Sequence, residues 1–514
     1  MTLYDLLATG ARNHPDRMVI HAKSREYTYL QLFRMVNRVA SALAADGISK
    51  GDRIALLLPN IPEFTVCYYA SITLGGVCVP ANPLLKPAEL KYIWSDSDIK
   101  AVVTLPSLLS NAMEATKDFA VTPRMICVSD RQSVPTGIAV LEELLDVGSD
   151  KPISMPELSE NDAAVCIYTS GTEGKPKGAL LSHRNLIRNC AQFTQVIYFK
   201  PEDNLLCVLP LFHSFAATVC QNASIFCGCS FTMIEMFHPG RVFEAIEKYK
   251  VTIFPGVPSM YAAIAHHTPD REYDLSSLQL CVSGGAPMPV ALMRDVESKY
   301  GVIIIEGDGP TECSPVTSAN PPNGVRKPGS IGLPLPEMEM QIWDDNDHEL
   351  PDGEIGELVV RGDNVMLGYH NQPKATAEAM RHGWYHTGDL GYRDSDGYFY
   401  IVDRKKDMII MGGINIYPRE IEEVLYSHPM ILAAAVIGIP HEVRGEDIVA
   451  VIQLKEGAEI TSREIISYCR ERLANFKVPR KVFIRSSLPH GGTGKVLKRL
   501  LKKELEMEMT LHEG

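Results

Sequence analysis

Two hydrophobic patterns alternate along the first half of the chain. Continuous apolar runs, such as residues 53–58 and 77–80, predict strands that are buried on both faces. Between them lie stretches such as residues 31–45, where Leu32 and Val36 begin an apolar stripe at helical spacing. Strands that alternate with helices are typical of βαβ units. We therefore expect an α/β fold, whose large multi-layer N-terminal domain contains mainly parallel sheets.

The alternation resumes in the middle third of the chain and then changes. Apolar runs at residues 251–254 and 278–283 each end in a turn of glycine and proline, at residues 255–258 and 284–287. Ligands bind at the carboxyl ends of parallel strands, so these turns are candidate walls of a pocket, although plain turns would look the same. After Gly332 the pattern becomes one of short β segments separated by Gly and Asp, including residues 338–343, 357–361 and 398–402.

A run of charge at residues 403–407 precedes a new and smaller α+β pattern. A composition shift of this kind indicates a domain boundary, whereas a charge run alone is more often a solvated turn. We expect an N-terminal domain of residues 1–402 and a small, mobile α+β C-terminal domain of residues 403–514.

A glycine-rich loop, residues 168–178, follows the apolar run 163–167. It offers hydroxyl groups, backbone N–H groups and two lysines, which together suit phosphate. A surface turn rich in Gly and Lys is the alternative. The loop is not a Walker P-loop, because Pro176 follows Lys175 and no glycine stands five positions before Gly174. A kinase-like or GTPase-like function therefore loses its main support.

Composition narrows the function classes. The 514 residues exceed what one hydrophobic core usually serves, so two or more domains are expected. The formal net charge of -13 argues against a dedicated nucleic-acid binder, and anions must be met by local positive clusters. The 12 cysteines are scattered, and Cys227 and Cys229 have no further ligands at zinc spacing. We expect free thiols in a reducing compartment.

One stretch, residues 205–234, has no Asp, Glu, Lys or Arg and is long enough to span a bilayer. Pro210 and Gly228 interrupt it, so a strand and a helix buried in a soluble core are the better interpretation. The N-terminal residues lack the basic start and apolar core of a signal peptide. We expect a cytoplasmic protein without an integral membrane segment. Peripheral membrane contact and a homodimer are compatible with the sequence.

Four further motifs follow the glycine-rich loop in order. They are residues 308–312 (Asp-Gly-Pro-Thr-Glu), 385–389 (Tyr-His-Thr-Gly-Asp), 403–407 (Asp-Arg-Lys-Lys-Asp) and 489–495 (Pro-His-Gly-Gly-Thr-Gly-Lys). With these motifs, nearly the whole chain resembles the adenylate-forming superfamily, which includes acyl-CoA synthetases, luciferases and the adenylation domains of peptide synthetases. Within this superfamily, the chain is most similar to fatty acid–CoA ligases.

The resemblance implies an ATP-dependent ligase that joins a carboxylic acid to CoA in two steps. A carboxylate is a poor acyl donor, so it first attacks the α-phosphate of ATP, which gives acyl-AMP and pyrophosphate. The CoA thiol then takes the acyl group and AMP leaves. Because both reactants of the first step are anions, the site must supply positive charge, in part from Mg²⁺.

The resemblance also assigns roles to individual residues. The catalytic residues would be Lys495, Glu312 and Thr169, and the last two would bind Mg²⁺ through oxygen atoms. The nucleotide would be bound by Thr169, Ser170, Gly171, Thr172, Lys177, Gly285, Ala286, Gly309, Thr311, Asp389, Arg404 and Lys495. The acid would be bound by His213, Gly284, Gly285 and Gly309. Gly412 and Gly413 would line a tunnel for the pantetheine of CoA, and Asp403 would be the hinge of the C-terminal domain.

Three positions keep alternatives open. Asp308 stands where family members usually carry an aromatic residue that stacks on adenine, and a carboxylate cannot stack. Glu173 likewise stands where a hydroxyl residue is common. His213, alone in an apolar run, could also be an ordinary core histidine.

The nature of the acid follows from the scarcity of charge in residues 205–228 and 257–262. An amino-acid substrate is disfavoured, because its ammonium group would need a buried acidic partner. A medium- or long-chain fatty acid is the first choice, and an aryl or alicyclic acid is the alternative. Two other functions remain: a ligase that passes acyl-AMP to a carrier protein, and an inactive binding protein. The latter is disfavoured because Lys495, Glu312 and Asp389 are all present.

Overall fold

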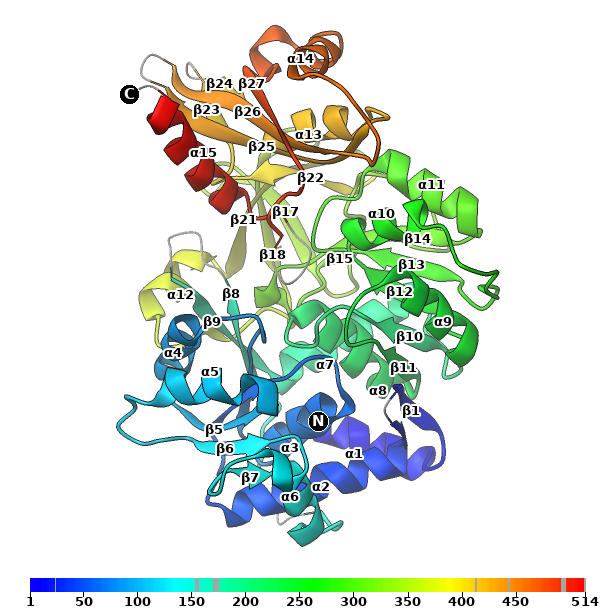
Figure 1. Cartoon of the computed structure of the whole chain (residues 1–514), viewed down its shortest axis with the longest axis vertical. Coiled ribbons are helices and arrows are strands. Elements are labelled where there is room, and N and C mark those ends of the chain that lie inside the picture. Colours follow the sequence, from blue (N-terminus) through cyan, green and yellow to red (C-terminus); the bar gives the residue numbers. More distant parts are fainter. Residues whose placement is uncertain are drawn as a thin grey trace.

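The computed structural model describes residues 1–23, 25–152, 157–169, 175–411, 414–441, 444–490 and 496–512. It has a large part formed by the N-terminal residues and a smaller part, at the top of Figure 1, formed by the C-terminal residues. The large part contains two mainly parallel sheets, which confirms the predicted α/β class.

The first sheet has nine strands in the order β16-β15-β14-β13-β12-β10-β11-β1-β2. Strands β14 to β1 along this order are parallel, whereas β2, β15 and β16 are antiparallel to their neighbours. The bounds are β1 (Met18–His21), β2 (Glu26–Thr28), β10 (Asn204–Cys207), β11 (Ser230–Met233), β12 (Ile253–Gly256), β13 (Leu280–Ser283), β14 (Ile303–Asp308), β15 (Ser318–Ala319) and β16 (Leu333–Pro334).

The second sheet has eight strands in the order β19-β9-β8-β4-β3-β5-β6-β7. Strands β8 to β7 along this order are parallel, while β9 returns as an antiparallel partner of β8. The bounds are β3 (Arg53–Leu57), β4 (Val77–Pro80), β5 (Ile99–Thr104), β6 (Arg124–Cys127), β7 (Ala139–Val140), β8 (Ala163–Thr169), β9 (Lys177–Ser182) and β19 (Gly368–Tyr369).

Helices join these strands and cover the sheets. The bounds of the α-helices are α1 (Leu3–Asn13), α2 (Tyr29–Ala45), α3 (Pro62–Thr73), α4 (Pro87–Asp96), α5 (Pro106–Thr116), α6 (Leu141–Val147), α7 (His183–Ile197), α8 (Ala223–Cys227), α9 (Pro239–Tyr249), α10 (Pro258–His266), α11 (Val290–Tyr300) and α12 (Pro373–Ala379). The 3-10 helices η1 (Arg131–Ser133) and η3 (Thr311–Cys313) and the π-helix η2 (Ala216–Asn222) complete this part. Several begin with proline, whose fixed φ suits the first helical turn. The predicted stripe of α2, with Leu32 and Val36, is buried.

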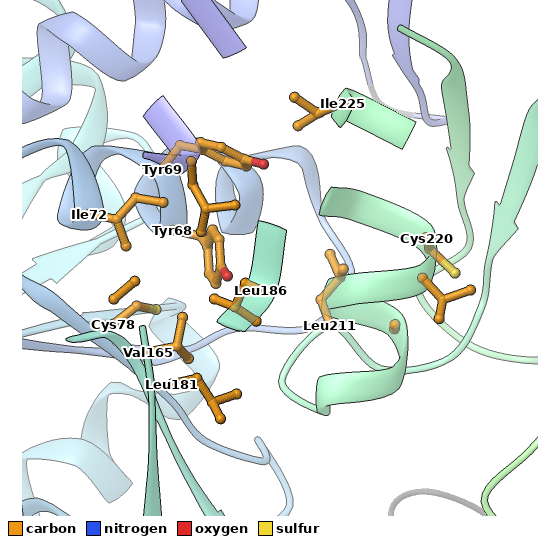
Figure 2. Packing of buried hydrophobic residues seen from close by; sticks show 14 of the residues in the cluster. Tyr68, Tyr69, Ile72, Cys78, Val165, Leu181, Leu186, Leu211, Cys220 and Ile225 are labelled. Atoms are coloured by element: carbon orange, nitrogen blue, oxygen red, sulfur yellow. The ribbon is translucent and has the colours of Figure 1, made fainter. Parts of the chain in front are cut away.

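One large hydrophobic core joins the two sheets. Figure 2 shows Tyr68 and Tyr69 of α3 with side chains of the eight-stranded sheet, of α7 and of α8. The same cluster includes Leu205 and Phe231 from the nine-stranded sheet. The uncharged run 205–234 supplies β10, the π-helix η2, α8 and β11 to this part of the fold. Within the described ranges, no helix is both long and apolar enough to cross a bilayer.

A third, antiparallel sheet leads to the C-terminal part. It contains β17 (Glu339–Trp343), β18 (Gly356–Arg361), β20 (Met380–Arg381), β21 (Trp384–Arg393) and β22 (Phe399–Arg404). Three of these strands match the predicted β segments after Gly332. The predicted hinge residue Asp403 lies near the end of β22.

The smaller C-terminal domain has a mostly antiparallel sheet and two hydrophobic clusters of its own, built from residues after 408. Its strands are β23 (Ile409–Met411), β24 (Ile414–Ile416), β25 (Ile431–His441), β26 (Gly445–Leu454) and β27 (Lys481–Arg485), and its helices are α13 (Pro418–Tyr426), α14 (Ser462–Arg470), η4 (Asn475–Lys477) and α15 (Lys498–His512). The α+β pattern expected after the charge run is therefore present.

Candidate functional site

A tight turn after β14 carries Glu312. The backbone is so crowded there that a Cβ atom on Gly309 would lie 2.0 Å from the carbonyl oxygen of Pro315. Asn189 of α7 accepts a hydrogen bond from the N–H of Val316 at 3.0 Å and donates one to its carbonyl oxygen at 2.6 Å. The turn thus requires glycine at 309 for packing, and α7 fixes its position. The nucleotide-binding role of Gly309 stays a prediction.

The Glu312 carboxylate is buried and accepts hydrogen bonds from two hydroxyl groups. The Thr169 Oγ1 donates to its Oε1 at 3.3 Å, and the Tyr369 hydroxyl donates to the same oxygen at 2.9 Å. Thr169 ends β8, Tyr369 ends β19 and Glu312 belongs to η3, so three distant segments meet here. Burial and the nearby carboxylate of Glu312 raise the pKa of Tyr369, which keeps its phenol a hydrogen-bond donor.

The oxygen atoms of Glu312 and Thr169 are of the type that Mg²⁺ prefers. Among the described residues, no group of three or more His, Cys, Asp or Glu side chains could hold a metal by itself. A Mg²⁺ ion at this place would therefore complete its shell with water and phosphate oxygens, as Mg²⁺ usually does. The two protein oxygen atoms therefore suit a Mg²⁺ ion that binds together with the phosphates of a nucleotide.

Two lysines flank the glycine-rich loop. Lys177 begins β9 opposite Thr169, and its Nζ lies 5.3 Å from the ring centroid of Tyr369. The Nζ of Lys175 lies 5.5 Å from the ring centroid of Tyr92, whose hydroxyl donates to the carbonyl oxygen of Pro176 at 3.1 Å. The structure therefore places the predicted phosphate ligand Lys177 beside the tyrosine that contacts Glu312.

A second charged pair lies across β21 and β22. Asp389 and Arg404 are cross-strand neighbours, and the Arg404 Nε lies 3.0 Å from the buried Asp389 carboxylate. The carboxylate of Asp389 raises the pKa of Arg404, against the effect of burial, and Asp308 and Glu312 add to this increase. Arg404 thus pairs with Asp389, and its charge also interacts with that of the predicted Mg²⁺ residue Glu312. Asp308, at the position usual for an aromatic residue, lies in the field of the same guanidinium.

Phe215 connects two of the predicted acid-binding residues, His213 in the loop after β10 and Gly284 directly after β13. A Cβ atom on Gly284 would lie 3.1 Å from the ring of Phe215, so that ring packs against the glycine backbone. The backbone N–H of Phe215 donates to His213 Nδ1 at 3.2 Å. Gly285 has φ +73°, a conformation that favours glycine, and it is exposed beside the half-buried Ala286.

This acid-binding segment also contacts the Glu312 turn. The hydroxyl groups of Ser214 and Thr311 lie 3.1 Å apart, and Thr218 of the π-helix η2 donates to the carbonyl oxygen of Ser314 at 2.7 Å. Thr218 therefore faces the turn. Contact between the two segments follows from the tertiary structure alone.

Asp403 is buried between the two parts of the chain. It accepts hydrogen bonds from the N–H groups of Arg404, at 2.7 Å, and of Arg419, at 3.0 Å. Burial raises the pKa of Asp403, and Lys498 opposes this increase. Asp403 thus connects β22 with the start of α13, as a hinge residue would, but its role as a hinge stays a prediction.

Six predicted site residues lie outside the described residues: Ser170, Gly171, Thr172, Gly412, Gly413 and Lys495. Sequence reasoning in turn missed Tyr369 and Asn189. Neither lies in a recognisable local motif, and each reaches Glu312 or its turn only through the fold.

Comparison with known proteins places the chain in a family. Residues 7–370 match the family model described as AMP-binding enzyme, and residues 420–495 match the AMP-binding enzyme C-terminal domain. A long-chain-fatty-acid–CoA ligase from Bacillus subtilis is 37% identical, over 98% of this chain and 95% of that protein. A feruloyl-CoA synthase from Amycolatopsis is 38% identical, over 95% of this chain and 96% of that protein.

Solved structures agree over the full length. An anthranilate CoA ligase in complex with anthranoyl-AMP gives a TM-score of 0.93 at 27% identity, over 99% of this chain and 98% of that chain. MatB from Rhodopseudomonas palustris, at 32% identity over 98% of this chain and 99% of its own, gives 0.90 in its ATP-bound form and 0.79 in its apo form. Over its whole length, the present chain thus superposes more closely on the ATP-bound form of this relative than on its apo form. The chain belongs to the AMP-binding enzyme family, in which it is an acyl- or aryl-CoA ligase of the adenylate-forming type that uses ATP, Mg²⁺ and CoA.

Proposed function

We propose that this ligase activates medium- or long-chain fatty acids. The observation that carries the proposal is the segment of residues 205–234, which has no charged side chain and is largely buried in the core. Its Phe215 ring packs against Gly284, which directly follows β13. An apolar chain gains from such surroundings, whereas a charged substrate tail would need a partner that this segment does not offer. The long-chain-fatty-acid–CoA ligase of Bacillus subtilis supports the same substrate class.

The first step needs the acid carboxylate and the α-phosphate of ATP to meet despite their like charges. We assign Glu312 and Thr169 to Mg²⁺, which neutralises phosphate charge, and Lys177 to the phosphates. Asp389 would accept hydrogen bonds from the ribose hydroxyls, while Arg404 holds that carboxylate in place. Lys495 would stabilise the charge that develops on the α-phosphate, an assignment that rests on the family resemblance. Attack then gives acyl-AMP and pyrophosphate.

The second step would follow a rotation of the C-terminal domain about Asp403. The higher TM-score against the ATP-bound form of MatB supports the view that the present arrangement is the one used for adenylation. Rotation would withdraw Lys495 and bring Gly412 and Gly413 to the pantetheine tunnel. The CoA sulfur then attacks the acyl carbon, and AMP leaves.

Separate assays of the two half-reactions test whether each one uses a different position of the C-terminal domain. We expect Lys495→Ala to slow acyl-AMP formation by about 100-fold or more, because one charged donor to the transition state is lost. Conversion of preformed acyl-AMP to acyl-CoA should stay at the wild-type rate. Lys503→Ala, at an exposed position of α15, is the matched control. Equal losses in both half-reactions would contradict the rotation.

An aryl acid is the second candidate substrate. The ring of Phe215 against Gly284 offers a flat wall that a planar acid could contact, and the feruloyl-CoA synthase relative supports it. Pyrophosphate release with ATP and Mg²⁺ is to be measured for acids from acetate to palmitate, and for benzoate and ferulate, each with and without CoA. Release with CoA consumption for C8 to C16 acids supports the proposal. A preference for ferulate or benzoate would replace it, and release without CoA consumption would indicate a carrier-protein acceptor.

A further inference from the structure

Two cysteines lie together at the turn that follows the π-helix segment. Cys227 is the last residue of α8, Gly228 adopts a left-handed conformation at φ 73° and ψ 22°, and Cys229 immediately precedes β11. The two thiols are hydrogen-bonded to each other. Cα atoms two positions apart are separated by about 7 Å at most, and a folded turn brings them closer. This range meets the distance that a disulfide requires.

The surroundings make the two thiols unequal. All 12 cysteines of the sequence lie in the described ranges, and Cys227 is the one that is not buried. Cys229 is fully buried, and its Sγ lies 2.9 Å from the carbonyl oxygen of Lys200. The pair therefore combines one half-buried cysteine with one that is fully buried.

A positively charged side chain fixes the turn. Arg17 donates to the carbonyl oxygen of Gly228 at 3.0 Å, and His14 also lies close to this glycine. The hydrogen bond from Cys229, together with Thr194, lowers the pKa of Cys227, whereas the bond to Cys227 and burial raise the pKa of Cys229. A cysteine that is not fully buried and whose pKa is lowered, with a second thiol in contact, is typical of cysteines that react with oxidants.

We propose that Cys227 and Cys229 are a modification site at which a hydroperoxide forms a reversible disulfide. The Cys227 thiolate attacks one peroxide oxygen, so that an S–O bond forms, the O–O bond breaks and, with hydrogen peroxide, water leaves. The sulfur of Cys229 then attacks the sulfenic sulfur of Cys227, so that the S–S bond forms and a second water leaves. Two thiols and one hydrogen peroxide thus give one disulfide and two waters, and a dithiol reductant reverses the oxidation.

A second pair of cysteines provides an internal control. Cys207 and Cys220 also have thiols in hydrogen-bonding contact, but both are fully buried, and burial raises the pKa of Cys220 far above its ordinary value. Proximity is common to both pairs, whereas incomplete burial and a lowered pKa belong to Cys227. We therefore expect the native protein to be oxidised at Cys227 and Cys229 and not at Cys207 and Cys220.

Peptide mass spectrometry of the full-length protein tests the proposal. The native protein is treated with hydrogen peroxide, quenched with catalase, denatured, alkylated and cleaved with chymotrypsin. Cleavage after Phe226 and Phe231 gives a peptide of residues 227–231 that contains both cysteines and no others. We expect this peptide to resist alkylation and to lose about 2 Da, the mass of two hydrogens, until dithiothreitol is added before alkylation.

Two variants separate the roles of the thiols. Cys229→Ser should leave a sulfenic acid on Cys227 that dimedone traps, whereas Cys227→Ser should give neither the adduct nor a disulfide. The wild-type measurement needs no variant, and thermal melts show that each variant is folded. Oxidation at Cys207 and Cys220 to the same extent, or an unchanged 227–231 peptide at peroxide doses that oxidise other cysteines, would overturn the proposal.

Discussion

Glu306 of β14 provides a test of the contact between the two parts of the chain. Its side chain is 6% exposed, and its Oε2 accepts a hydrogen bond from the N–H of Gly329 at 2.8 Å. Burial raises the pKa of Glu306 to about 7. The hydrogen bond from Gly329 and the charge of Arg419 oppose this increase, and Glu423 adds to it. Arg419 and Glu423 belong to α13 of the C-terminal domain, so the carboxyl group reports on the interface between the domains.

The sign and size of the effect follow from proton linkage. Because the folded-state pKa lies above the unfolded value of 4.5, folding is favoured by this group below pH 4.5. That contribution is lost as the pH rises to about 7, where the buried carboxylate ionises. Between pH 5 and pH 8 the free energy of unfolding should fall by about 2.5 kcal/mol, at about 1.4 kcal/mol per pKa unit. Glu306→Gln removes this dependence, because an amide does not ionise.

Thermal melts of wild type and Glu306→Gln at pH 5 and pH 8 measure the difference. For 514 residues, the entropy of unfolding is about 1 kcal/mol per kelvin, so the variant should gain about 2 °C in Tm at pH 8 relative to pH 5. Glu456→Gln, at an exposed position, is the control and should show no such gain. A variant whose Tm advantage is the same at both pH values would refute the assignment of a raised pKa to Glu306.

Two further predictions concern the Glu312 turn. Tyr369→Phe removes the 2.9 Å hydrogen bond to Glu312, the proposed Mg²⁺ ligand, so KM for MgATP should rise by about 10-fold. KM for the acid should not change, and equal changes in both KM values would contradict this role of Tyr369. Gly309→Ala places a methyl group 2.0 Å from the carbonyl oxygen of Pro315 and should destabilise the protein by about 3 kcal/mol, seen as a lowered Tm. Gly240→Ala, where the nearest atom to the new Cβ would belong to the His238 side chain at 3.3 Å, is the control for a glycine outside the left-handed region, and an equal loss there would show that crowding at residue 309 is not the cause.

Local patterns were sufficient for many individual elements. The strand predicted at residues 77–80 is β4 with the same bounds, and the helix predicted at residues 31–45 is α2 with two more residues at its start. Alternating apolar runs and helical stripes report burial directly, since a strand buried on both faces has little room for polar side chains. Five ordered motifs identified the family, and the comparisons confirm it.

Other features depend on contacts that no local pattern encodes. The π-helix η2 is one, because an apolar run does not distinguish its hydrogen bonding from that of an ordinary helix. Tyr369 is another, because it reaches Glu312 only after β19 pairs with β9. The predicted roles of the loop, tunnel and lysine residues outside the described ranges still rest on the resemblance alone.

The sequence by itself determined the family, the reaction class and the types of residue available for catalysis, because the order of the motifs and the chemistry of the side chains do not depend on how the chain folds. The tertiary structure decided which of those residues meet. Thr169, Glu312 and Tyr369 converge although they lie far apart in sequence, and Asp389 meets Arg404 across two strands. The reason is physical: hydrogen bonds and ion pairs act over a few ångströms, so a site exists only where the packing of sheets and helices brings distant strand ends together.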